Sequence, residues 1–197
     1  INVTKLSEFR RARYLGRVFQ DPMMGTAADM NIEENLALAF RRGQRRTLRW
    51  GVTAAERKQY RELLKQLDLG LENRMTSKVG LLSGGQRQAL TLLMATLKPP
   101  KLLLLDEHTA ALDPKTAAKV LALSSRFIQE EHLTALMVTH NMRDAISQGN
   151  RLLMMHEGRI IIDVAGEEKK KLTVEALLDM FGKVSGQQLA NDRMLLS

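Results

Sequence analysis

The sequence has no cysteine among its 197 residues, so disulfide bonds and thiolate metal sites are excluded within it. It has no apolar run near the roughly 18 residues that a membrane-spanning helix needs, and no signal-peptide pattern is visible. Only 4% of the residues are aromatic, too few for the stacking platforms that hold single-stranded nucleic acid. These absences predict a chain that meets any membrane through a partner protein.

Positive charge is in excess, with a formal net charge of +8 and a pI near 10.0. A basic chain can bind nucleic acid, an anionic membrane surface or a polyphosphate. The densest cluster is the segment Arg41 to Arg46, with Arg49 close by. Such a run is most often a solvated face, and we interpret it so. The few aromatic residues argue against binding of single strands, and we expect no nucleic-acid partner.

The second half of the sequence alternates between short apolar runs and helical patterns. Lys101 to Leu105 reads KLLLL and Thr134 to Thr139 reads TALMVT, and both are typical of strands buried on two faces. Between them, Asp113 and Pro114 open a helix that runs to about Glu131. Strand, helix and strand in this order predict βαβ units and a mostly parallel sheet.

The first half is mostly helical in pattern. A short strand is expected at Arg17 to Phe19, followed by helices from Met30 to Arg42, from the capping box at Thr53 and from Gln86 to Leu97. We therefore predict an α/β fold with an inserted helical subdomain. The predicted division is an α/β core at 1–22 and 99–165, a helical subdomain at 23–98, and a C-terminal helix and tail at 166–197. Residues 151–164 predict a hairpin within that core.

One stretch, Leu81 to Leu90, reads LLSGGQRQAL and places two glycines at the start of a helix. Ser83 is a candidate N-cap, and a helix N-terminus with glycines can approach an anion closely. The alternative is a tight turn before a core helix. These ten residues do not separate the two interpretations.

Polar residues follow each expected strand. Asp106 and Glu107 follow KLLLL, His140 follows TALMVT, and Gln20 follows the strand at 17–19. In a parallel sheet, functional residues gather at the carboxyl ends of the strands. An isolated Asp-Glu pair is usually a solvated turn and an isolated histidine is usually structural, but their occurrence together with SGGQ favours a binding site.

The order of these motifs resembles the nucleotide-binding domain of ATP-binding-cassette (ABC) ATPases. The resemblance rests on Gln20, LSGGQ at 82–86, LLLLDE at 102–107, ALD at 111–113 and His140, and it covers nearly the whole chain. It implies a P-loop NTPase-like parallel core, with ATP and Mg²⁺ as cofactors. The segment from Arg41 to Leu67 also resembles ATPase subunits of bacterial importers for amino acids or other small solutes.

The resemblance assigns a role to each motif residue. Gln20 would coordinate Mg²⁺ or position water, and Asp106 would hold Mg²⁺ through its water shell. Glu107 would be the catalytic carboxylate that polarises the attacking water, and His140 would lie near the γ-phosphate. Asp113 would lie across a dimer interface. The signature residues Ser83, Gly84, Gly85 and Gln86 would contact the ATP that the opposite subunit binds.

The same resemblance implies partners and a location. We expect a head-to-tail homodimer on the cytoplasmic face of the cell membrane, attached peripherally to a permease that a solute-binding protein supplies. The segment from Asp21 to Asn35 is the expected docking surface, with Met23, Met24, Met30 and Ile32 as its apolar contacts. The alternative functions are soluble ABC ATPases of DNA maintenance or translation. Against these, no heptad run is sustained between Gln20 and Ser83, and the sequence has no internal repeat.

Two features depart from the family pattern. The phosphate-binding pattern GxxxxGK[ST] does not occur, and the nearest string, Gly182 to Ser185, follows no expected strand. We therefore expect an incomplete core, and we expect these residues not to hydrolyse ATP by themselves. His108 stands where many relatives have proline. It could tune its loop, face solvent or touch the edge of the nucleotide.

Overall fold

The computed structural model describes residues 2–44 and 51–185. The chain divides into two compact units, residues 1–138 (unit 1) and residues 139–197 (unit 2). None of the helices in the described segments is long and apolar enough to cross a membrane.

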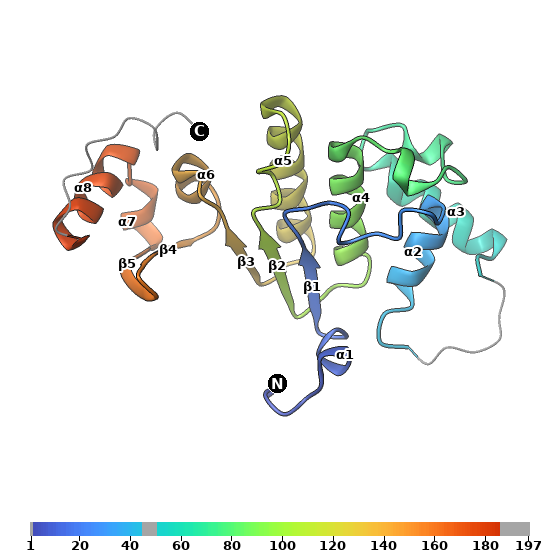
Figure 1. Cartoon of the computed structure of the whole chain (residues 1–197), viewed down its shortest axis with the longest axis horizontal. Helices are drawn as coiled ribbons and strands as arrows, with labels where there is room; N and C mark the ends of the chain where they lie inside the picture. The colour runs from blue at the N-terminus through green and yellow to red at the C-terminus, as the bar shows by residue number, and fades with distance from the viewer. Residues whose placement is uncertain (1, 45–50, 186–197) are drawn as a thin grey trace. The chain divides into compact units, whose positions relative to one another are not determined.

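Unit 1 contains a three-stranded parallel sheet, drawn in Figure 1 with α4 and α5 beside it. The strands are β1 (Leu15–Val18), β2 (Leu102–Asp106) and β3 (Ala135–Val138), and β2 lies in the middle. This order confirms the predicted α/β class. Because the strands are parallel, the residues that follow them lie at one edge of the sheet.

The third strand is less buried than its sequence predicts. Leu136 is 52% exposed and Val138 is 50% exposed, and within unit 1 only Met137 of this strand packs against the main core. The prediction that TALMVT is buried on both faces is therefore wrong. A short apolar run predicts a strand, but β3 pairs only with β2 among the described strands, and the run does not specify what covers its faces.

Helices form the rest of unit 1. They are α1 (Glu8–Arg11), α2 (Ile32–Phe40), α3 (Ala54–Lys65), α4 (Gly84–Thr96) and α5 (Pro114–Glu130), with 3-10 turns η1 (Leu71–Asn73) and η2 (Val79–Leu81). The predicted capping box of α3 is present, since Thr53 Oγ1 accepts from the Glu56 N–H and the Glu56 side chain accepts from the Thr53 N–H. Helix α4 packs against β1, α2 and α5. The main core lies around it, with Leu90 and Leu92 fully buried.

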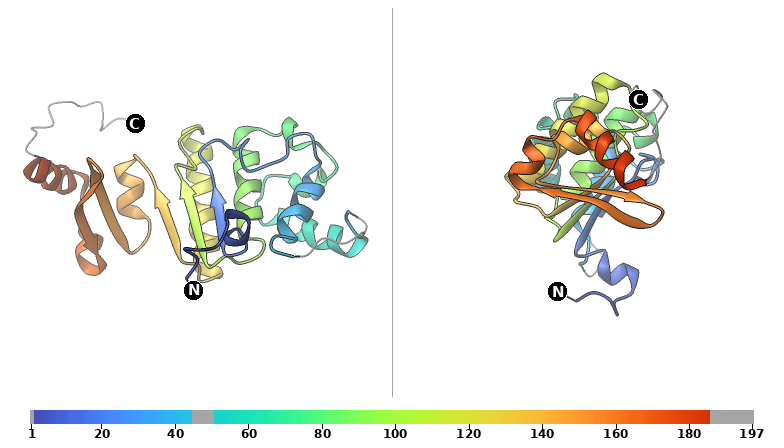
Figure 2. Two further views of the ribbon diagram at one scale, coloured as in Figure 1. Left: turned by 60° about the horizontal axis from the view of Figure 1, so that its bottom comes forward. Right: turned by 90° about the vertical axis from the view of Figure 1, so that its left-hand side faces the viewer.

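Unit 2 is a hairpin covered by helices. After α6 (Met142–Ser147) come β4 (Arg151–His156) and β5 (Arg159–Ala165), then α7 (Gly166–Lys170) and α8 (Val174–Ser185). The antiparallel hairpin, orange in Figure 2, confirms the prediction, and its turn residues Glu157 and Gly158 have φ angles of 47° and 75°. Its apolar side chains pack with Leu177 of α8. The sequence did not predict α7, and the expected tail lies mostly outside the described residues.

Candidate functional site

The carboxyl edge of the parallel sheet brings together three of the predicted site residues. Gln20 follows β1 after one residue and is exposed, whereas Asp106 ends β2 and Glu107 follows it, both partly buried. Val18 is in register with Leu105, so the two loops leave neighbouring strands at nearly the same level. His140 belongs to unit 2, where it is exposed and comes two residues after Val138 in the chain.

Glu107 has an uncommon backbone conformation. Its φ angle is 43°, in the left-handed region that glycine favours, and its N–H donates to the carbonyl oxygen of Val138 over 3.0 Å. Strained backbone of this kind persists where the surrounding structure holds it, and it is common at functional sites. The bond to β3 therefore fixes where the predicted catalytic carboxylate leaves the sheet.

Asp106 is paired with an arginine that the sequence did not single out. Nη2 of Arg17, on β1, lies 3.1 Å from Oδ2 of Asp106, and the two side chains are 52% and 45% exposed. The same guanidinium lies over the ring of Phe19, 4.4 Å from its centroid. An exposed ion pair contributes only about 0–1 kcal/mol, so a bound cation can displace it. The pairing depends on strand register, which local sequence patterns do not reveal.

The start of α4 carries the signature residues. Ser83 is its N-cap, because Ser83 Oγ accepts from the Gln86 N–H over 3.3 Å and Gln86 Oε1 accepts from the Ser83 N–H over 3.2 Å. The two glycines differ in surroundings. A Cβ on Gly84 would lie 3.6 Å from its nearest neighbour, on Leu112, whereas one on Gly85 would lie 2.0 Å from Cγ2 of Thr116. Gly85 thus permits close packing on α5, and Gly84 leaves the helix end accessible.

Asp113 caps the neighbouring helix α5. Its Oδ1 accepts from the Thr116 N–H over 3.1 Å, and the hydrogen bonds from Thr116 lower the pKa of this carboxyl. Since Leu112 and Thr116 are the neighbours of the two signature glycines, the N-termini of α4 and α5 lie side by side. The structure therefore brings Asp113 next to the signature.

His108 is buried behind the loop of Glu107, with 2% of its surface exposed. Its Nε2 lies 2.8 Å from Oγ of Ser124, and the Ser124 hydroxyl donates to the carbonyl oxygen of Val120. Because that hydroxyl has one proton, the imidazole Nε2–H is the donor to Ser124. Burial lowers the pKa of His108 to about 4, so the ring is neutral near pH 7. Of the roles considered, tuning the loop fits, and facing solvent does not.

The donor set at the sheet edge fits Mg²⁺ held jointly with a nucleotide. Among residues 2–44 and 51–185, no three or more His, Asp or Glu side chains gather into a group that could hold a metal. Asp106 offers a carboxylate and Gln20 offers an amide oxygen. Mg²⁺ keeps several waters and takes one or two protein oxygens plus phosphate oxygens, so a cage of protein ligands is not required.

The basic segment that begins at Arg41 is not simply a solvated face. Arg41 pairs with Glu56 over 2.8 Å. Arg42 donates to the carbonyl oxygens of Ala95 and Lys98 at the C-terminus of α4, where a cation is favourable. Residues 45–50 of this cluster lie outside the described residues.

The expected docking segment divides into exposed and buried residues. Met23 and Met24 are 48% and 68% exposed, whereas Ile32 is fully buried in the main core. The expectation that Ile32 contacts a partner is therefore wrong, because it begins α2 and packs inward.

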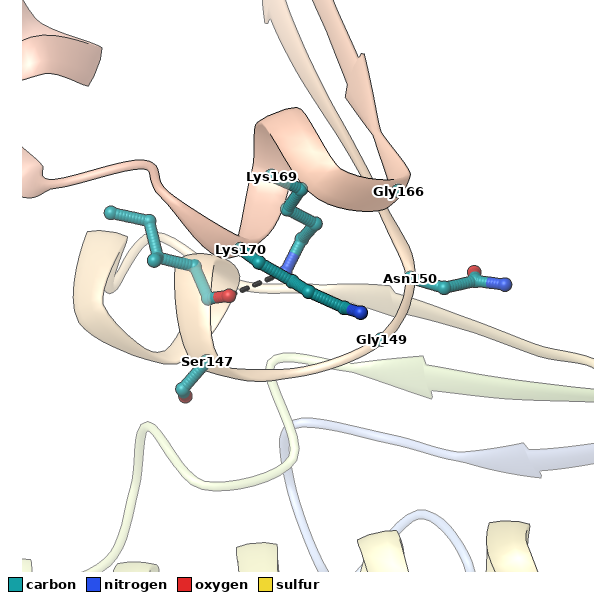
Figure 3. A pocket seen from close by; sticks show the side chains of 7 residues that line it. Ser147, Gly149, Asn150, Gly166, Lys169 and Lys170 are labelled. Atoms are coloured by element: carbon teal, nitrogen blue, oxygen red, sulfur yellow. Dashed lines mark hydrogen bonds between the residues drawn. The ribbon is translucent and has the colours of Figure 1, made fainter.

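Unit 2 contains a pocket, and the lysine that lines it has a structural role. Figure 3 shows the Lys169 side chain pointing into the pocket. The Lys169 amino group donates to the carbonyl oxygen of Ile146, and to that of Gln148 over 2.7 Å. The amino group therefore satisfies carbonyls at the C-terminal end of α6, and burial lowers its pKa. The lining residues are Ile146, Ser147, Gly149, Asn150, Gly166, Lys169 and Lys170.

Comparison with known proteins supports the resemblance to ABC ATPases. Residues 2–110 match the family model described as ABC transporter. Over 183 residues the chain is 45% identical to the "Tyrosine transport ATP-binding protein" of Clostridioides difficile (strain R20291), covering 91% of this chain and 71% of that protein. Over 170 residues it is 32% identical to the "Methionine import ATP-binding protein MetN" of Streptococcus pneumoniae (strain ATCC BAA-255 / R6), covering 83% of this chain and 45% of that protein.

A solved structure has the same fold. It is described as a dimeric structure of a post-hydrolysis state of the ATP-binding cassette MJ0796 bound to ADP and Pi. The match has a TM-score of 0.67 and 28% sequence identity, and it covers 84% of this chain and 70% of that one. Fold, motif order and family match agree, and the chain belongs to the ATPase family of ABC transporters.

Proposed function

We propose that the chain is part of the ATP-hydrolysing subunit of an importer for amino acids or similar small solutes. The observation that carries the proposal is the sheet edge where Gln20, Asp106 and Glu107 leave neighbouring parallel strands. Names of relatives support import, since two of them are a tyrosine transport protein and a methionine import protein. The chain spans 71% of the first relative and 45% of the second, so activity, substrate and partners are part of the proposal.

The residues at the sheet edge divide the chemistry among them. Asp106 and Gln20 would hold Mg²⁺, which when bound neutralises charge on the phosphate oxygens. Glu107 would accept a hydrogen bond from the attacking water and polarise it toward the γ-phosphate. For His140, which belongs to unit 2, the family resemblance implies a hydrogen bond to a γ-phosphate oxygen. The backbone of Glu107 is held by a hydrogen bond, which supports the role of this residue. A carboxylate on a held backbone needs to move little to reach the attacking water.

The signature would act on the nucleotide of a second copy of the chain. The start of α4 presents N–H groups and a partial positive charge, and Gly84 leaves room for a phosphate to approach. Asp113 lies beside it and would face the same interface. We therefore propose a head-to-tail homodimer with two composite ATP sites. The dimeric state of the structural neighbour supports this arrangement.

Coupling to transport would run through the exposed start of the helical subdomain 23–98. Met23 and Met24 are apolar, adaptable and exposed, as a docking surface for a permease requires. They follow Gln20 closely in the chain, so a shift of the Gln20 loop on nucleotide binding would move the docked permease. The subunit would thus lie at the cytoplasmic face of the membrane, and a solute-binding protein would act on the permease only.

The test is transport by the complete gene product. The complete gene product and a candidate permease are reconstituted together in vesicles, and uptake of radiolabelled tyrosine and methionine is measured with and without ATP. We expect ATP-dependent uptake of an amino acid, which Glu107→Gln abolishes. ATP hydrolysis without permease binding or uptake of either solute would contradict import and favour a soluble ABC ATPase.

A further inference from the structure

One buried side chain contacts the backbone next to both catalytic loops. Gln88, in the second turn of α4, is 0% exposed. Its Nε2 donates to the carbonyl oxygen of Phe19 over 2.9 Å and to that of His108 over 2.7 Å. Phe19 directly precedes Gln20, and His108 directly follows Glu107. A single amide nitrogen therefore links the loop of the proposed magnesium ligand to the loop of the proposed catalytic carboxylate.

The two ends of the Gln88 amide differ in their hydrogen bonding. Both contacts of Nε2 are carbonyl oxygens, so the NH₂ group must face them. The other end, Oε1, is buried and has no hydrogen-bond partner among the described residues. An unsatisfied buried acceptor destabilises the fold, and an apolar side chain of similar length would avoid that cost. The two donated bonds are thus the distinctive contribution of glutamine at this position.

Glu107 is held on both sides by the same network. Before it, the Glu107 N–H donates to the Val138 carbonyl oxygen over 3.0 Å. After it, His108 is held through its carbonyl oxygen by Gln88 and through its ring by Ser124. The positive φ of Glu107 is a conformation that a free loop would leave, so these contacts set the direction of its side chain.

We propose that Gln88 is a positioning residue that couples the place of Glu107 to that of the Gln20 loop and of the signature helix. The inference rests on the proposed ATPase function. Gln88 lies on α4, whose N-cap is Ser83, so a shift of α4 when the signature engages a nucleotide moves Gln88 and both loops with it. Gln88 acts through Glu107 and Gln20, and it does not itself contact the nucleotide.

The test is Gln88→Met in the complete gene product, with kcat and KM for ATP measured by phosphate release. Methionine keeps the length and removes both donors. We expect kcat to fall roughly 10- to 100-fold, because misplacing a catalytic group slows the chemical step, while KM changes by less than about threefold. In a Glu107→Gln background the same change should lower the residual rate by a much smaller factor, because the part of its effect that passes through Glu107 is already lost.

Controls separate positioning from stability. Thr96→Val removes a buried hydroxyl at the other end of α4, whose bonds go to Leu92 and Leu93 of the same helix. Leu64→Ala, in α3, lowers stability from a fully buried position of the same core. Both should keep wild-type kcat at a temperature at which they are folded. If Gln88→Met does not fold, Ser124→Ala loosens the same loop, and it should lower kcat about three- to tenfold with KM unchanged.

The outcomes distinguish this inference from the proposed function. If the wild-type protein hydrolyses no ATP, the proposed function fails. If it does so in a Glu107-dependent way but Gln88→Met and Ser124→Ala both keep wild-type kcat, only the coupling role fails. A kcat loss in the two controls equal to that in Gln88→Met would also overturn it.

Discussion

The residues that would contact the nucleotide differ in burial from the residues that lie beneath them. The edge residues, Gln20, Ser83, Gly84, Asp106, Glu107 and Asp113, are exposed or partly buried. The support layer, Gly85, Gln88, His108 and Ser124, is buried. The difference shows that one set of residues would carry out the chemistry and another set holds those residues in place. A substitution at an edge residue that is not a helix cap should change chemistry with little change in stability, whereas one in the support layer should change stability, placement or both.

The two signature glycines give the sharpest contrast. Gly85→Ala puts a Cβ 2.0 Å from Cγ2 of Thr116, so we expect a loss of about 1–3 kcal/mol in the free energy of unfolding. Gly84→Ala has room and should not lower stability, but it should lower ATP turnover roughly tenfold or more by blocking the phosphate. Urea unfolding and phosphate release measure the two effects.

A second substitution checks the cause of the Gly85 effect. Thr116→Ser removes the clashing methyl group and keeps the hydroxyl and the N–H that bonds Asp113. The Gly85→Ala, Thr116→Ser pair should recover most of the lost stability. If the pair is as unstable as Gly85→Ala alone, the clash is not the reason for this glycine.

The docking segment offers the same contrast at a smaller scale. Met24→Glu changes a side chain that is 68% exposed, so folding and basal ATP hydrolysis should persist. Uptake and permease-stimulated hydrolysis should fall together, several-fold, because a charge opposes apolar docking. Ile32→Ala, at a fully buried position, should instead cost about 2–5 kcal/mol of stability. Unchanged uptake with Met24→Glu would move the docking surface elsewhere.

The lowered pKa of His108 predicts that the free energy of unfolding depends on pH. Burial lowers its pKa to about 4, below the ordinary value of 6.5, so the unfolded chain binds the proton more readily than the folded one. Its contribution to stability is complete above about pH 6.5 and is lost as the pH falls toward 4. Between pH 7 and pH 4.5, His108→Asn should therefore lose about 2 kcal/mol less than the wild type. Parallel stability curves would show that His108 does not titrate this way.

The sequence predicted where the edge residues lie on strands and helices, because those signals are local. The order of motifs placed Gln20 and Asp106 after parallel strands, and Ser83 and Asp113 are helix caps as their residue types predict. Each of these depends on a few neighbouring residues.

The support layer could not be predicted because it depends on contacts far apart in the chain. The bonds of Gln88 reach Phe19 and His108, and nothing in the local pattern of α4 distinguishes this glutamine from a surface residue. Strand register likewise brings Arg17 to Asp106, and the sequence of β3 does not specify what covers its faces, so it did not predict that Val138 is exposed.

The role of Glu107 is the central claim, and a single-turnover measurement tests it most directly. The complete gene product and its Glu107→Gln variant are mixed with Mg²⁺ and radiolabelled ATP, quenched at intervals, and assayed for bound and cleaved nucleotide. Glutamine keeps the shape and loses the charge that polarises water, so ATP should bind within a few-fold of wild-type affinity and be cleaved about 1000-fold more slowly. Cleavage at the wild-type rate by Glu107→Gln would contradict the assignment of the catalytic edge.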